Sequence, residues 1–263
     1  MTTGVAGQVL ALAGRSALRT ARQPAAWLPG VLLPLIVAAV FTANYRQAAA
    51  IIRFPGSASY PQYVLPATVL IGAIYPGIAA GTAATADLES GFMRRLLIAP
   101  SWRPALIAGP LAVAAMQSLV SGGTAVAVFA AVGTRVHGGV TGALVILGSA
   151  ALLAVGIGAL AVALGLRTGD SEVMQSLFGV LFILLFLSSA FFPPAVMRGW
   201  FHAAAAHSPL TWMADGMRGQ VLAAAGTPGA SGAARALAVP SAACAAAVAL
   251  TARALRSAAR DGT

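Results

Sequence analysis

Lysine is absent from this sequence of 263 residues, and charged residues of any kind are scarce. All 16 basic residues are arginine, only six residues are acidic, and charged side chains make up 8% of the chain. A soluble domain carries about 25% charged residues, so this composition excludes a soluble globular enzyme. The absence of lysine also excludes a P-loop and a Schiff-base lysine on this chain. Any energy drawn from ATP has to come from another polypeptide.

Cysteine and histidine are almost as rare. Cys244 is the only cysteine, which excludes a disulfide framework and a CxxC metal or redox pair. His137, His202 and His207 lie outside the long apolar runs and have no acid at metal-ligand spacing. We therefore expect no metal site and no catalytic residue. The net charge of +10 does not indicate nucleic-acid binding, because the arginines are spread between apolar runs instead of gathering on one face.

Apolar runs are what the sequence has in abundance, since 59% of its residues are hydrophobic and its mean hydropathy is +0.86. A helix needs about 20 mostly apolar residues to cross a bilayer. The gaps between charges predict six such helices in a single transmembrane domain over residues 1–263, an all-α polytopic membrane protein. The predicted spans cover residues 25–44, 64–85, 105–132, 140–165, 173–192 and 236–252. Gly77 and Gly81, in the second span, have the spacing that lets helix backbones approach closely.

The distribution of arginine predicts the orientation of these spans. With the N-terminus inside, ten arginines lie on the cytoplasmic side and six on the outer side. This bias follows the positive-inside rule and predicts that both termini are cytoplasmic. The first residues carry no positive charge ahead of their short apolar stretch, so we expect the N-terminus to be retained.

Residues 4–22 predict an amphipathic helix that lies along the inner membrane surface. Arg15, Arg19 and Arg22 fall on one stripe, with small apolar residues beside them. A simple basic anchor on anionic membrane lipid and a specific docking role for a partner protein both fit this pattern.

Residues 87–100, between the second and third spans, predict a short cytoplasmic helix with one apolar and one basic face. Acids come first in this segment and arginines later, which complements the helix dipole, and Pro100 closes it. Phe92, Met93, Leu96 and Leu97 share one side, while Arg94 and Arg95 face the other. Such a helix, held between two spans, can act as a lever that moves both of them.

The segment that begins at Phe191 and continues through residues 193–222 is too apolar for a free loop, yet too broken by proline and glycine to span. It predicts short helices that re-enter the outer leaflet, where broken backbone is tolerated if protein covers it. The residues expected to form this outer gate are Phe191, Phe192, Pro193, Gly199, Trp200, Pro209 and Trp212. Asp215 and Arg218 stand three residues apart, and a structural pairing is favoured over the alternative of an ion site.

The predicted spans contain aromatic and weakly polar residues but no central charge. The lack of charge disfavours a channel and an ion-coupled carrier. Residues that would suit an amphipathic cargo arriving from the inner leaflet are Phe41, Tyr75, Gln117, Met174, Gln175, Phe182 and Phe186. Ordinary helix packing is the alternative interpretation for each of them.

The sequence resembles the ABC-2 type permeases, particularly the short bacterial ones associated with daunorubicin-type drug and antibiotic export. Their Glu-x-Gly-x-x-x-Arg-Leu-Leu-x-x-Pro pattern is matched by Glu89, Gly91, Arg95, Leu96, Leu97 and Pro100. Their outer-loop pattern is matched by Ser188, Ser189, Phe192, Pro193, Gly199, Trp200, Pro209, Leu210, Thr211, Trp212 and Arg218. Arg198 departs from this pattern, because the family usually has proline there.

This resemblance implies a permease in a bacterial cell membrane that pairs with a second copy or a homologue. Two copies of a separate ATPase would hold ATP and Mg, so that no cofactor binds to this chain. The residues that would contact the ATPase are Asp87, Glu89, Gly91, Phe92, Arg94, Arg95, Leu96, Leu97 and Pro100. The expected function is efflux of a hydrophobic or amphipathic, drug-like molecule. The alternatives are a permease for a lipid-linked glycan or lipid and, outside the family, a non-transporting membrane scaffold or immunity protein.

Overall fold

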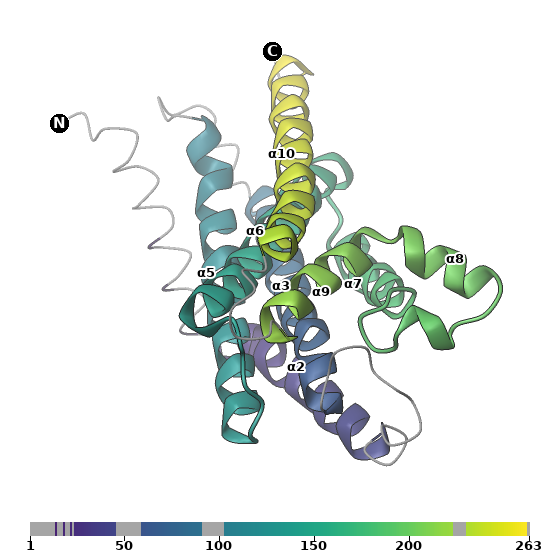
Figure 1. The fold of residues 1–263 in the computed structure, drawn as a ribbon. Helices are drawn as coiled ribbons and strands as arrows, with labels where there is room; N and C mark the ends of the chain where they lie inside the picture. The colour runs from purple at the N-terminus through teal and green to yellow at the C-terminus, as the bar shows by residue number, and fades with distance from the viewer. Residues whose placement is uncertain are drawn as a thin grey trace.

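The computed structural model describes residues 24–45, 59–90, 103–222 and 230–261, together with Gly14, Leu18 and Arg22. Within these residues every regular element is a helix, which agrees with the predicted all-α class (Figure 1). The elements are α2 (Pro24–Tyr45), α3 (Tyr60–Glu89), α5 (Arg103–Ala131), α6 (Gly139–Thr168), α7 (Ser171–Phe186), the 3-10 turn η2 (Pro194–Val196), α8 (Trp200–His207), α9 (Pro209–Leu222) and α10 (Ala230–Asp261).

Four stretches of these helices are long and apolar enough to cross a bilayer. They are Trp27–Tyr45, Tyr60–Asp87, Ala108–Ala131 and Gly139–Gly165, and they confirm the predicted spans 25–44, 64–85, 105–132 and 140–165. The apolar helical stretches Glu172–Phe186 and Ala236–Thr251 are shorter than the roughly 20 residues that a straight crossing needs. The spans over 173–192 and 236–252 therefore stay predictions.

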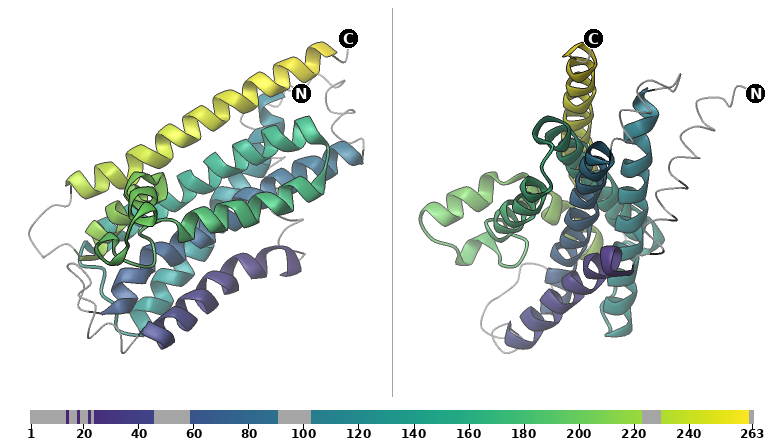
Figure 2. Two further views of the ribbon diagram at one scale, coloured as in Figure 1. Left: turned by 90° about the vertical axis from the view of Figure 1, so that its right-hand side faces the viewer. Right: turned by 180° about the vertical axis from the view of Figure 1, so that it is seen from behind.

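Helix α3 is the centre of the bundle. It packs against α2, α5, α6, α7 and α9, while α10 lies along α6 and crosses α9 (Figure 2). Most of its large apolar side chains, including Leu65, Leu70 and Ile74, are fully buried. Helix α8 packs against η2 and α9 and projects from the side of the bundle (Figure 1). We refer to the end of the bundle that carries α8 and α9 as the α9 end.

Small residues bring α3 and α6 together, as the four-residue spacing of glycines predicts. A Cβ atom at Gly77 would lie 2.9 Å from the carbonyl oxygen of Ala154 and from the side chain of Ile157. At Gly81 it would lie 2.5 Å from the Cβ of Ala161. Both positions therefore need glycine for the two backbones to approach this closely.

We expect Gly81→Ala to destabilise the bundle even though alanine is the better helix former. The added methyl group overpacks the α3–α6 contact at a cost of about 1–3 kcal/mol. Gly123→Ala is the matched control, because no atom lies within 4 Å of a Cβ at Gly123. This control should be neutral or stabilising by up to about 1 kcal/mol. Equilibrium unfolding in detergent and SDS measures both changes, and an equal effect of the two substitutions would contradict the packing argument.

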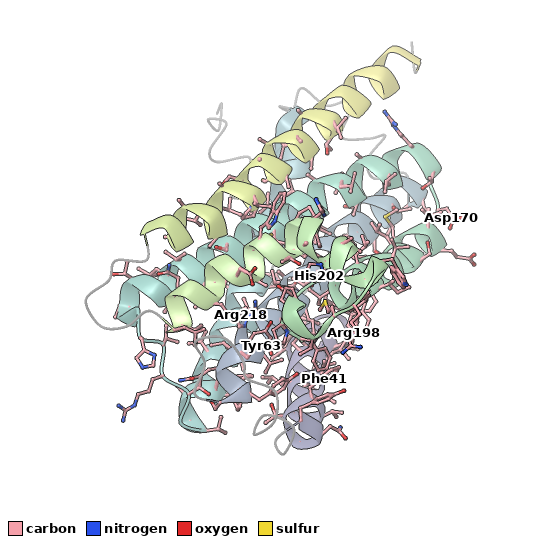
Figure 3. All side chains as sticks on the ribbon, turned by 45° about the vertical axis from the view of Figure 1, so that its right-hand side comes forward. Phe41, Tyr63, Asp170, Arg198, His202 and Arg218 are labelled. Carbon is pink, nitrogen blue, oxygen red and sulfur yellow. The ribbon has the colours of Figure 1, made fainter. Side chains whose placement is uncertain are left out.

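The turn between α6 and α7 is specified locally by the sequence. Helix α6 ends at Gly169, which adopts the left-handed conformation with φ of 63° that glycine favours. Asp170 then caps α7, since its carboxylate accepts a hydrogen bond of 2.7 Å from the backbone N–H of Glu172. This tight turn holds α6 and α7 side by side at the end of the bundle away from α9 (Figure 3).

Two helix ends differ from the predicted segment boundaries. Helix α3 continues through Glu89, so Asp87 and Glu89 lie in its last turn instead of starting a separate helix at residue 87. Helix α7 ends at Phe186, six residues before the predicted end of the fifth span at residue 192. It stops there because the hydroxyl of Ser188 forms hydrogen bonds with neighbouring backbone groups. This hydroxyl donates to the Leu185 carbonyl and accepts from the N–H of Ala190.

The segment after α7 consists of short helices, as the density of proline and glycine predicts. Pro193 precedes η2, and Gly199 precedes α8 with φ of 62° and ψ of −139°, a conformation open essentially to glycine alone. Pro209 begins α9. The depth of these helices in a membrane, and hence the re-entrant placement of residues 193–222, stays a prediction.

Candidate functional site

Arg218 holds the α9 end of the bundle together. It is only 6% exposed, and its guanidinium lies 3.9 Å above the ring of Tyr63 in α3 (Figure 3). It donates to the backbone carbonyls of Tyr63 at 3.3 Å, Ser189 at 2.6 Å and Ala190 at 3.1 Å, and it pairs with the carboxylate of Asp215. The pairing of Asp215 with Arg218 confirms the sequence prediction. We call Tyr63, Ser189, Ala190, Asp215 and Arg218 the Arg218 cluster.

The Arg218 cluster keeps a buried cation satisfied. Burial lowers the pKa of Arg218 from its usual value, while the nearby Tyr63 and Asp215 act in the opposite direction. Arginine titrates so far above neutrality that the side chain stays charged. All three guanidinium nitrogens donate to acceptors, and one face of the group meets an aromatic ring. The role of Arg218 is therefore structural, because it ties α3, the turn after α7 and α9 to one another.

A continuous row of aromatic rings runs along α7 and onto α2 and the turn after α7. Along α7 the ring centroids of Phe178 and Phe182 are 5.6 Å apart, and those of Phe182 and Phe186 are 5.0 Å apart. Phe191 continues the row, 4.7 Å from Phe186 and 4.6 Å from Phe41 of α2. Tyr75 of α3 joins its other end at 6.2 Å from Phe178. We call these six residues the aromatic row, and their separations are those of directly interacting rings.

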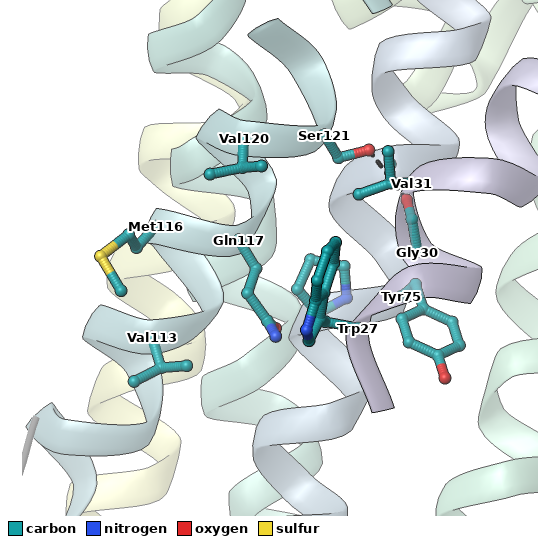
Figure 4. A pocket seen from close by; sticks show the side chains of 11 residues that line it. Trp27, Gly30, Val31, Tyr75, Val113, Met116, Gln117, Val120 and Ser121 are labelled. Atoms are coloured by element: carbon teal, nitrogen blue, oxygen red, sulfur yellow. Dashed lines mark hydrogen bonds between the residues drawn. The ribbon is translucent and has the colours of Figure 1, made fainter. Parts of the chain in front are cut away.

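A cavity of about 200 Å³ lies between α2, α3 and α5 (Figure 4). Its walls are almost entirely apolar. The residues that line it are Trp27, Gly30, Val31, Gly72, Tyr75, Pro76, Val113, Met116, Gln117, Val120 and Ser121. This volume is smaller than the roughly 300–1,000 Å³ that is usual for sites of drug-sized ligands.

The floor of this cavity follows from a proline in α2. Pro34 has no N–H, so it cannot donate to the carbonyl of Gly30 four residues earlier. The hydroxyl of Ser121, from α5, donates to that carbonyl at 2.8 Å instead. A side chain at Gly72 of α3 would collide with this hydroxyl, so glycine is needed there. The three residues thus join α2, α3 and α5 at one point.

We expect Ser121→Ala to destabilise the protein by about 1 kcal/mol, because the buried carbonyl of Gly30 loses its donor. Thr124→Ala is the control, since the Thr124 hydroxyl donates only to the Val120 carbonyl of its own helix. Unfolding in detergent and SDS measures both variants. If the two substitutions cost the same, the bond between α5 and α2 does not stabilise the bundle.

The residues predicted to line a cargo path separate into distinct environments. Tyr75 and Gln117 line the cavity, while Phe41, Phe182 and Phe186 belong to the aromatic row, which Tyr75 also joins. Met174 is fully buried and contacts the α3–α6 packing at Gly81, which assigns it to the core. The side chain of Gln175 lies outside the described residues.

The residues predicted to form the outer gate also occupy different environments. Phe191 is 1% exposed within the aromatic row, and Phe192 packs edge-on to Tyr45 at 4.9 Å. Trp200 is 74% exposed, and Arg198 and His202, two residues away on either side in the sequence, are exposed as well. Trp212 is 47% exposed and donates its indole N–H to the Ala206 carbonyl at 3.2 Å.

Only part of the predicted ATPase contact can be placed. Asp87 and Glu89 lie in the last turn of α3, at the end of the bundle away from α9. Gly91, Phe92, Arg94, Arg95, Leu96, Leu97 and Pro100 lie outside the described residues, as does most of the predicted interface helix over 4–22.

Sequence reasoning missed Trp27, Tyr63 and Phe178. The four-residue spacing of Phe178 from Phe182 was a readable signal for the aromatic row. Pro34 was a signal that the Gly30 carbonyl needs another donor. The sequence gives no local signal for which distant residue completes a contact. Tyr63 lies 126 residues from its partner Ser189, and Gly30 lies 91 residues from its partner Ser121.

This bundle of apolar helices belongs to a known class of membrane proteins. A family model described as ABC-2 type transporter matches residues 7–222, and the chain belongs to that family. It is therefore a multi-pass membrane protein. Over 192 residues it is 29% identical to the daunorubicin resistance ABC transporter permease protein DrrB1 of Streptomyces coeruleorubidus. The alignment covers 72% of this chain and 65% of that relative.

Proposed function

We propose that this chain is the membrane-spanning subunit of an ATP-driven exporter that moves a hydrophobic or amphipathic small molecule out of a bacterial cell. The observation that carries this proposal is the aromatic row, in a chain of the ABC-2 family. Phe41, Phe182 and Phe186 are partly exposed, so a guest molecule can reach them. Stacked rings offer apolar contact to molecules of different shapes, which suits a drug-like cargo.

Energy reaches the bundle through the end of α3. The helix has 30 residues, which at 1.5 Å per residue makes a rod about 45 Å long. Its last turn carries Asp87 and Glu89, the first two acids of the segment 87–100 that we propose as the contact with the ATPase. Because α3 packs against five neighbours and carries Tyr63 and Tyr75, a displacement of its end is transmitted to both the Arg218 cluster and the aromatic row.

The working unit in this proposal is a pair of permeases, a second copy or a homologue, with two copies of a separate ATPase that hold ATP and Mg. Helices α7 and α10 complete six crossings, both termini are cytoplasmic, and the α9 end faces outward. Residues 4–22 lie on the inner surface against anionic lipid. Exposed Trp200 then sits in the interface, where the amphipathic tryptophan ring is favoured.

Co-purification tests whether a motor binds. The affinity-tagged permease, expressed with ATPase subunits encoded in the same genome, should recover an ATP-hydrolysing chain in equal amount. The Glu172→Gln variant, which changes an exposed acid in the first turn of α7, should recover it equally well. Recovery of the permease without any ATPase from every such preparation would favour a scaffold or immunity protein instead.

A further inference from the structure

The cavity between α2, α3 and α5 opens where α5 has exposed side chains. Met116 and Val120 of α5 stand at its mouth and are 49% and 53% exposed, while Gly30, Gly72 and Ser121 form its closed floor. In a bilayer this mouth faces hydrocarbon, because the outward face of both helices is apolar. A guest therefore reaches the cavity from the membrane and not from water.

Two polar groups reach into this otherwise apolar space. The indole of Trp27 and the amide of Gln117 both point into the cavity (Figure 4). Within the described part of the chain, neither side chain makes a hydrogen bond to protein. The indole N–H can only donate, and the amide can donate as well as accept. A guest that offers an acceptor oxygen can satisfy both groups at once.

Charge complementarity limits the guest further. No charged side chain occurs among the eleven residues that line the cavity. Acids in the described ranges are found at the two ends of the bundle, at Asp87, Glu89, Asp170, Glu172, Asp215 and Asp261. A cationic guest would lose its hydration without gaining an anionic partner, which costs several kcal/mol. The cavity therefore selects against a charged molecule.

We propose that this cavity binds an uncharged, mostly apolar molecule with a hydrogen-bond acceptor such as a ring carbonyl, and that this molecule is the cargo on its way from the inner leaflet. The second half of this statement rests on the proposed function. Trp27 lies near the end of α2 away from the α9 end, which is the cytoplasmic side in the proposed orientation. Tyr75 belongs to both the cavity and the aromatic row, so the cavity leads onto that row.

The binding test uses the full chain in phosphatidylcholine nanodiscs, with 1-hydroxyanthraquinone as the uncharged probe and an aminoethyl derivative as its cationic counterpart. Equilibrium dialysis measures binding. We expect the uncharged probe to bind at least tenfold more tightly than the cationic one. Gln117→Leu and Trp27→Phe should each weaken binding of the uncharged probe by about threefold to tenfold, the value of one hydrogen bond.

Filling the cavity gives the sharpest comparison. Val120→Phe places a ring in the mouth and should abolish binding, whereas Leu119→Phe adds the same ring at an exposed neighbour that does not line the cavity. Equal binding by these two variants would overturn the proposal, as would equal binding of the two probes. Binding in detergent that disappears in nanodiscs would show that membrane lipid is the occupant, and would overturn it too.

A transport assay distinguishes failure of the cavity proposal from failure of the proposed exporter function. In vesicles containing the permease and its ATPase, Val120→Phe should stop ATP-driven export of the uncharged probe, and Leu119→Phe should not. Export that persists in Val120→Phe would leave the exporter in place and remove the cavity as its cargo site. If no compound is exported but the probe binds as described, the proposed exporter function is wrong and the proposed binding site remains supported.

Discussion

Arg218→Met is expected to be the most destabilising single substitution considered for this protein, with a loss of about 3–5 kcal/mol. The substitution preserves most of the side-chain length but leaves the buried carbonyl of Ala190 without its donor, and it leaves the carbonyl of Ser189 with the Tyr63 hydroxyl alone. It also removes the cation from the ring of Tyr63. Equilibrium unfolding in detergent and SDS measures the loss.

Arg198→Met is the matched control, because Arg198 lies in the same outer segment but is exposed. It should leave stability nearly unchanged. Arg218→Lys separates the contribution of the charge from that of the guanidinium shape. Lysine keeps the positive charge but lacks the planar guanidinium that reaches three carbonyls and a carboxylate at once. This variant should therefore recover only part of the lost stability. If Arg218→Met and Arg198→Met behave alike, the Arg218 cluster does not hold the α9 end together.

Arg95→Ala and Glu89→Gln are expected to reduce ATP-driven export by about tenfold or more while the permease remains folded and bound to its ATPase. A coupling free energy of about 1–3 kcal/mol between two sites corresponds to changes of this size. Glu89 lies in the last turn of α3, so altering its contact disconnects the motor from the central helix without touching the core.

The readout for these two variants is the ratio of molecules exported to ATP hydrolysed in vesicles that contain both subunits. Glu172→Gln makes the same chemical change at an exposed acid at the same end of the bundle, and should leave the ratio at the wild-type value. A normal ratio in Arg95→Ala and Glu89→Gln would remove the lever role of residues 87–100. Loss of the ATPase from the purified complex would assign these residues to assembly instead.

The long helices could be read from the sequence because their signal is local. Each confirmed span is an uninterrupted apolar stretch between charges, and a bilayer selects for that pattern alone. The pairing of Asp215 with Arg218 was also local, since residues three apart on a helix are neighbours. The tight α6–α7 turn follows the same logic, with Gly169 and Asp170 each in its preferred position.

Contacts between distant helices could not be read in this way. The sequence shows that Pro34 frees the carbonyl of Gly30, but not that Ser121 supplies the missing hydrogen bond. It shows that Phe182 and Phe186 share a face, but not that Phe41 of α2 meets that face through Phe191. Met174 looked like a path residue because methionine suits both cores and cargo surfaces, and only its burial against Gly81 assigns it to the core.

Reconstitution tests the central claim most directly. Vesicles containing the permease with its ATPase should move 1-hydroxyanthraquinone across the membrane when ATP and Mg are supplied on the cytoplasmic face. Vesicles with either subunit alone, or with a non-hydrolysable ATP analogue, should not. Equal movement with and without ATP, or with the ATPase omitted, would contradict the account of this chain as the permease of an ATP-driven exporter.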